Sequence, residues 1–248
     1  MRLELATWQE VEKYLHRSKG IIIPIGSTEQ HGPIGLIGTD AICAQEIAFE
    51  VGEQTDTLVS PVIAVGMAQH HMAFPGTMTL RPSTLIAVIT DTLMSLVSHG
   101  FERFFFINGH GGNQATIEAA FQEFHHLTTT NEHALASKAQ CKLENWWRHK
   151  EVTELAEQLF GSDEGAHATP SEVAVTLHHY PELYSNTTLT KLTDQSCIIN
   201  GAEDFRKRYP DGRIGADSSM ATPELGARIQ AAAVTALSRE YQAFNSLE

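Results

Sequence analysis

The sequence predicts an α/β fold in which helices cover both faces of a mostly parallel β-sheet. A rhythm of strand, loop and helix repeats at least three times along the 248 residues. The first strand, at 21–25, is a short apolar run like those of strands buried on both faces. Parallel strands need right-handed crossovers through helices, so the rhythm indicates βαβ units within one sheet.

The first half of the chain supplies two strands and three helices. In order, the expected elements are helix 8–16, strand 21–25, helix 41–54, strand 58–65 and helix 84–98. Thr7 precedes the first helix and Ser83 the last, and both are typical N-cap residues. Pro61 cannot donate a hydrogen bond to a β-ladder, which predicts an edge or irregular strand at 58–65.

The second half begins with a third strand and continues mainly with helices. The expected elements are strand 103–107 and helices 114–126, 151–160, 170–178, 202–207 and 223–244. Residues 129–145 are ambiguous, because both helix and strand fit around 134–143. No internal repeat, low-complexity tract or linker divides the chain, so we expect residues 1–248 to form a single domain.

The composition restricts the class of protein and of partner. The chain is 42% hydrophobic and 19% charged, which is ordinary for a globular protein with a sizeable core. A net charge of −13, with no basic block among the 17 Lys and Arg residues, argues against nucleic acid or an anionic membrane as the main partner. Three scattered cysteines and the lack of a signal-peptide pattern or membrane-spanning run lead us to expect a cytoplasmic protein.

Three potential metal ligands lie in the glycine-rich loop after the strand at 21–25. They are Glu29, His31 and Asp40. In open α/β sheets, reactive groups collect in the loops beyond the carboxyl ends of the strands. Glu29 and His31 are two residues apart, so in an extended segment their side chains point the same way. Asp40 stands at the start of a helix, where backbone donors can hold one oxygen and leave the other free.

Three further residues occupy comparable places later in the chain. His110 follows the strand at 103–107 within Asn-Gly-His-Gly-Gly-Asn, while Glu172 begins a later helix, five residues after His167. Two imidazoles and three carboxylates suit two divalent ions per chain that share a hydroxide and polarise a substrate oxygen. The full set of expected metal ligands is Glu29, His31, Asp40, His110 and Glu172. Zinc fits such ligation best, with manganese or iron as alternatives.

Five of these six residues also have a purely structural interpretation. Glu29 can be a solvated loop carboxylate and Asp40 a helix N-cap. Glu172 can be the acidic residue of a capping box. His110 can belong to a backbone nest that binds an anion, and His167 can be a turn residue.

The combination of motifs resembles the creatininase (creatinine amidohydrolase) family. The motifs are Gly-Ser-Thr-Glu-Gln-His-Gly, Gly-Thr-Asp, His-x-x-Phe-Pro-Gly-Thr, Asn-Gly-His-Gly-Gly-Asn and Gly-Ala-His-Ala, followed by the run from Gly215 to Gly226. The resemblance covers nearly the whole chain. It implies an α/β/α sandwich, a dinuclear metal centre, a homohexamer and hydrolysis of non-peptide C–N bonds.

The resemblance also implies roles for individual residues. Glu29 and His110 bind one ion, His31 binds the other, and Asp40 bridges them. His167 matches the residue that protonates the leaving nitrogen. Creatininases have a ligating Glu where this chain has Gly112, which puts creatinine itself in doubt, and Glu172 is the carboxylate that can take over.

Three residues are further candidates for substrate binding, namely His71, Phe74 and Trp146. Their alternatives are a solvated loop position for His71 and core packing for Phe74 and Trp146.

We therefore expect a metal-dependent amidohydrolase acting on a small cyclic amide or formamide, with His167 and Glu172 in proton transfer. A metallopeptidase that trims a short modified peptide and a metal- or ligand-binding protein without turnover are the alternatives.

Overall fold

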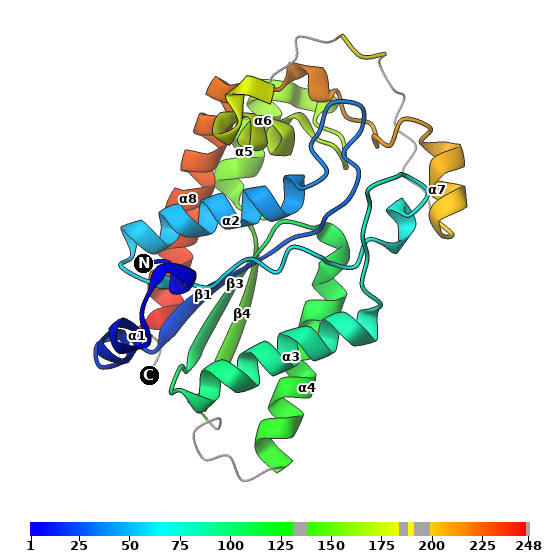
Figure 1. The fold of residues 1–248 in the computed structure, drawn as a ribbon. Coiled ribbons are helices and arrows are strands. Elements are labelled where there is room, and N and C mark those ends of the chain that lie inside the picture. Colours follow the sequence, from blue (N-terminus) through cyan, green and yellow to red (C-terminus); the bar gives the residue numbers. More distant parts are fainter. Residues whose placement is uncertain (131–137, 184–187, 191–198, 247–248) are drawn as a thin grey trace.

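The structure is a computed structural model that describes residues 1–130, 138–183, 188–190 and 199–246. Its centre is a parallel four-stranded sheet with the strand order β2–β1–β3–β4 (Figure 1). The strands are β1 (Gly20–Ile25), β2 (Leu58–Val59), β3 (Arg103–Asn108) and β4 (Gln140–Asn145). All residues of β1 are buried, as its unbroken apolar run predicts.

Side chains that alternate along the central strands build a separate core on each face of the sheet. Ile22 of β1 and Phe105 of β3 belong to one core, whereas Ile21 and Phe104 belong to the other. The first core is covered by α2 (Thr39–Gln54), α5 (Lys150–Phe160), α6 (Pro170–His179) and α8 (Pro223–Asn245). The second is covered by α1 (Trp8–Leu15), α3 (Pro82–Ser98) and α4 (Gln114–Thr130). The predicted three-layer α/β/α arrangement is confirmed.

Several boundaries differ from the predictions for identifiable reasons. The expected strand 58–65 shortens to β2, because Pro61 ends the ladder and the chain returns to β1 only through Ile63, whose N–H donates to the carbonyl of Pro24 at 3.0 Å. The N-cap of α3 is Arg81 rather than Ser83, since Pro82 takes the first helical position. The ambiguous segment 129–145 contains β4, and its residues 131–137 lie outside the described ranges.

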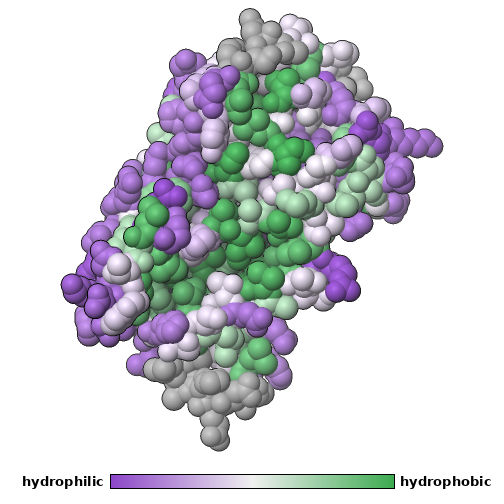
Figure 2. Space-filling model, in the orientation of Figure 1, coloured by the Kyte–Doolittle hydropathy of each residue, from purple (hydrophilic) through white to green (hydrophobic). Residues whose placement is uncertain are grey.

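The carboxyl ends of β1 and β3 position the loops that matter for function. In Figure 1 these ends point toward α6 and α7 (Ala202–Arg208) and away from both termini. Apolar side chains also gather on one surface, between α2 and α3 along the segment that follows β2 (Figure 2). Within the described ranges, no helix is both long and apolar enough to cross a membrane.

Candidate metal centre

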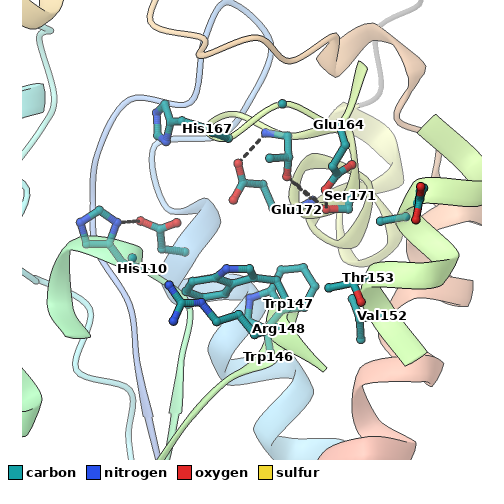
Figure 3. A pocket seen from close by; sticks show the side chains of 18 of the residues that line it. His110, Trp146, Trp147, Arg148, Val152, Thr153, Glu164, His167, Ser171 and Glu172 are labelled. Atoms are coloured by element: carbon teal, nitrogen blue, oxygen red, sulfur yellow. Dashed lines mark hydrogen bonds and ion pairs between the residues drawn. The ribbon is translucent and has the colours of Figure 1, made fainter. Parts of the chain in front are cut away.

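The predicted ligands meet beyond the carboxyl ends of β1 and β3, beside a cavity of about 770 Å³. Glu29 and His31 lie in the loop after β1, His110 directly follows the loop end of β3, and Asp40 and Glu172 lie in the first turns of α2 and α6. Figure 3 shows His110, His167 and Glu172 around one cavity, whose floor is formed by the turn that follows β4.

One group of ligand atoms belongs to Glu29, Asp40 and His110. Nδ1 of His110 lies 3.2 Å from Oε1 of Glu29 and 3.1 Å from Oδ2 of Asp40. Asn108 fixes the His110 loop, because its side chain accepts from the N–H of His110 at 3.0 Å and donates to the carbonyl of His110 at 2.7 Å. These three buried side chains therefore present their ligand atoms within 4.8 Å of one another.

A second group belongs to His31, Asp40 and Glu172. Nε2 of His31 lies 3.0 Å from Oδ1 of Asp40 and 3.9 Å from Oε1 of Glu172. Asp40 is common to both groups, with one oxygen directed to each imidazole. This is the arrangement of a carboxylate that can bridge two ions.

Hydrogen bonds to the backbone determine which nitrogen each imidazole offers to the site. Nε2 of His110 lies 3.0 Å from the carbonyl oxygen of Met67, and Nδ1 of His31 lies 3.2 Å from the carbonyl oxygen of Glu29. A carbonyl oxygen only accepts, so these nitrogens carry the proton and the other nitrogen of each neutral ring points its lone pair at carboxylates. A proton or a cation must lie between such groups.

Two unpartnered oxygens show that the residues fit metal ions. Oε1 of Glu29 and Oδ2 of Asp40 are buried and have no hydrogen-bond partner within the described part of the chain. Leaving ionised oxygens buried without partners is costly, and a cation next to His110 would satisfy both. The mixed imidazole and carboxylate donors suit zinc or manganese.

The close charges shift the pKa values in opposite directions. Burial alone would lower the pKa of His31, but the carboxylates of Asp40 and Glu172 raise it to about 10. Burial would raise the pKa of Asp40, but the neighbouring imidazoles of His31 and His110 hold it well below its usual range. Burial raises the pKa of Glu172 to about 7, against the opposing effect of His31. Without a cation, the imidazoles of His31 and His110 therefore retain their protons.

The position of Glu172 is compatible with both of the roles that the sequence allows. It forms the expected capping box with Thr169, whose N–H donates to Oε1 of Glu172 at 2.6 Å. The same side chain also reaches His31 and Asp40. Gly112, at the position where the sequence resemblance implies a ligating Glu in other family members, has no room for a side chain, because a Cβ there would overlap the His110 ring and the carbonyl of Met67.

His167 lies next to the ligands and is held by Gln30. Its Nε2 is 3.0 Å from the backbone carbonyl oxygen of Gln30, and its Nδ1 is 4.0 Å from Oε1 of Glu29. Burial and the charge of His31 lower the pKa of His167. The side-chain amide of Gln30 also lies 2.9 Å from Nδ1 of His71. Gln30 stands between two predicted ligands in the sequence, but its residue type alone does not predict this supporting role.

The three predicted substrate-binding residues occupy different places. Trp146 lines the cavity although its side chain is almost fully buried. His71 is buried next to Glu29, with its Nε2 3.3 Å from Oε1 of that residue, and it is not among the described residues that line the cavity. Phe74 packs in a small cluster with Phe205 and Tyr209 and is not among the described residues that line the cavity.

Comparisons with known proteins relate this geometry to one family. The sequence pattern of the family described as "Creatininase: Creatinine amidohydrolase" matches residues 4–241. A "Mycofactocin precursor peptide peptidase" from Mycolicibacterium smegmatis is 37% identical over 106 residues, which cover 40% of this chain and 42% of that protein. A "3-dehydro-scyllo-inosose hydrolase" from Thermotoga maritima is 30% identical over 119 residues, 48% of this chain and 38% of that protein. The matches thus span less than half the length of these curated relatives.

The fold is that of solved creatininases. A structure described as "Creatininase Mn" superposes with a TM-score of 0.86 at 20% identity and covers 99% of both chains. At that identity the superposition establishes the fold alone. The family pattern spans almost the whole chain, and we conclude that this protein belongs to the creatininase family.

Proposed function

We propose that the protein is a metal-dependent amidohydrolase that cleaves a non-peptide C–N bond of a small cyclic amide or formamide. The family membership supports the class of reaction, and the two ligand groups that share Asp40 support a centre with two ions. Glu29, Asp40 and His110 would hold one ion, and His31, Asp40 and Glu172 the other. When bound, such ions activate a water molecule and polarise the substrate carbonyl.

Two residues of this chain are suited to move the protons. Glu172, whose carboxylate lies beside His31 and Asp40, can accept a proton from the attacking water. Burial lowers the pKa of His167, so its ring is neutral before the reaction, with the Nε2 proton bound to the carbonyl of Gln30. His167 would therefore take up at Nδ1 the proton that Glu172 has accepted from the water, and pass it to the departing nitrogen.

The observation that carries this proposal is the pair of backbone-anchored imidazoles aimed at unpartnered carboxylate oxygens. The test combines elemental analysis with hydrolysis of creatinine, formamidopyrimidines and lactams. We expect His110→Ala to lose both bound metal and hydrolysis. The control is His70→Ala, which changes a neighbouring imidazole outside both ligand groups. Wild-type metal content and hydrolysis in His110→Ala would refute the assignment.

A second candidate is a metallopeptidase that acts on a short modified peptide. The volume of about 770 Å³ supports it, because that space exceeds what a small cyclic amide fills. Similarity to the mycobacterial peptidase points the same way. Release of terminal residues from short peptides, without hydrolysis of lactams or formamides, would favour this candidate.

We also propose a cytoplasmic homo-oligomer, a hexamer by family resemblance. The apolar surface between α2 and α3 (Figure 2) supports self-association, and the free thiols of Cys43 and Cys141 suit a reducing compartment. Light scattering during gel filtration tests the assembly, and the mass of a single chain at micromolar concentration would contradict it.

A further inference from the structure

We propose that Arg148 binds a carboxylate group of the substrate and so selects acidic amides. This inference rests on the proposed function, because it concerns the cavity beside the metal centre. Arg148 ends the short turn Trp146–Arg148, which directly follows β4. In Figure 3 its side chain runs beside the tryptophan pair along the floor of the cavity, toward the end that His110 occupies.

The turn that carries Arg148 is fixed relative to the ligand loop. Asn145, the last residue of β4, accepts a hydrogen bond at 2.8 Å from the side chain of Asn108. Asn108 in turn bonds to both backbone groups of His110. Trp146 is buried directly after Asn145. The backbone that carries Arg148 is thereby linked to the loop of His110, while the Arg148 side chain itself is exposed.

Arg148 is the only Lys or Arg among the described residues that line the cavity. The same lining contains four carboxylates, those of Asp40, Glu157, Glu164 and Glu172. Within the described part of the chain, Arg148 nevertheless forms no ion pair and no hydrogen bond. A guanidinium has five donors and is always charged, so this cation is available to a ligand.

The acidic residues nearest to Arg148 in sequence are paired with other groups. Glu144 lies 3.0 Å from Nζ of Lys142 and 3.4 Å from Nε2 of His149. Glu151 pairs with Arg239 at 2.6 Å. These pairs leave the guanidinium of Arg148 uncompensated beside the cavity.

The charges of the lining favour a carboxylate over a phosphate. A phosphate monoester carries nearly two negative charges at neutral pH, and four protein carboxylates would repel it more strongly than they repel a single charge. A carboxylate matches the guanidinium fork through two parallel hydrogen bonds. Trp147, also in the lining, offers a flat apolar surface to the same cavity. The inferred substrate therefore has a scissile amide at the metal end and a carboxylate near Arg148.

The test compares two probes that differ only in charge, N-formyl-L-phenylalanine and N-formyl-L-phenylalaninamide. Their affinities are measured by calorimetry on the metal-loaded and the metal-free protein. We expect the wild type to bind the acid about tenfold more tightly than the amide, a typical factor for one charge-assisted contact. In Arg148→Gln the two probes should bind equally within about twofold.

Lys150→Gln is the matched control, because it removes the same charge two residues away, where Lys150 pairs with Glu154 on the exposed side of α5. It should keep the wild-type preference. The inference is overturned if the wild type shows no preference, or if Arg148→Gln keeps it, since the metal ions would then hold the carboxylate. If the protein hydrolyses no amide but Arg148→Gln still loses the preference, the proposed function fails and the carboxylate site stands.

Discussion

At the scale of single residues, the backbone decides what each histidine can do. The carbonyl groups of Met67 and Glu29 engage one nitrogen each of His110 and His31. The other nitrogen of each ring faces an oxygen of Asp40. A buried, ionised carboxylate next to the lone pair of a nitrogen is unfavourable unless a proton or a cation lies between them. The chemistry of the site therefore follows from two ordinary hydrogen bonds.

Glu164 provides a pH-dependent prediction at this scale. It lines the cavity, accepts a hydrogen bond from Ser171 and has a buried Oε2 without a partner among the described residues. Burial raises its pKa above the ordinary value of 4.5, and Ser171 limits the rise. The folded protein thus binds this proton more tightly than the unfolded chain, so the associated stability is complete at low pH and is lost as pH rises through the folded pKa.

We therefore expect Glu164→Gln to gain stability relative to the wild type as pH rises above 4.5 and through the higher pKa of the folded state. Urea unfolding at several pH values measures the difference. Glu157→Gln, at an exposed carboxylate of the same cavity, is the control. A difference for Glu164→Gln that stays constant or shrinks with rising pH would contradict the interpretation.

At the scale of elements, the start of α6 connects helix capping with ligand position. Thr169→Ala removes the hydroxyl that accepts from the N–H of Glu172 at 3.2 Å. We expect a loss of about 1 kcal/mol in stability and weaker binding of metal, because Glu172 loses part of its support. Thr7→Ala removes the same cap from the box that Thr7 forms with Glu10 in α1, far from the site in sequence.

Chemical unfolding and metal titration of both variants separate the two effects. A similar loss of stability in both, with weaker metal binding only in Thr169→Ala, is the predicted pattern. Equal metal affinities in the two variants would show that the cap does not position Glu172.

Close packing between α6 and α8 supplies a second prediction for elements. A Cβ on Gly226 would overlap the carbonyl of Ala174. Alanine is the better helix former by about 1 kcal/mol, yet we expect Gly226→Ala to destabilise the protein by about 1–3 kcal/mol through overpacking. Ala231→Gly, at an exposed position of α8, measures the effect of helix propensity without a change in packing. The free energies of unfolding of both variants test the prediction, and a stabilised Gly226→Ala variant would refute the packing argument.

The elements also show what the sequence can and cannot predict. The strand at 21–25 was predictable because an apolar run of that length is too short for a helix and fits a buried strand. The capping box of Glu172 was predictable because Thr followed three residues later by Glu is typical of a helix start. The length of β2 was not predictable, because the sequence does not show whether the chain forms β-ladder hydrogen bonds with its neighbouring strand again after Pro61. Arg148 and Gln30 were missed because their importance lies in partners, or a lack of partners, that only the fold reveals.

At the scale of the whole molecule, the proposed metal centre joins parts that are distant in sequence. Its candidate ligands come from the loops after β1 and β3 and from the starts of α2 and α6, and α8 packs against both of these helices. Ions bound there would link both halves of the chain. A ligand that binds only the folded state, at 100 times its Kd, adds about 2.7 kcal/mol to stability.

We therefore expect chelation to lower the melting temperature and zinc or manganese to restore it. Calcium, which prefers sites made of oxygen ligands only, should restore it poorly. An unchanged melting temperature after complete removal of metal, verified by elemental analysis, would contradict a structural contribution of the ions.

The most direct test of the account is anomalous diffraction from crystals grown with excess zinc. The account predicts two strong peaks in each chain, one between Glu29, Asp40 and His110 and one between His31, Asp40 and Glu172, with Asp40 contacting both. Absence of any peak between these residues, with the imidazoles still anchored as described, would contradict it.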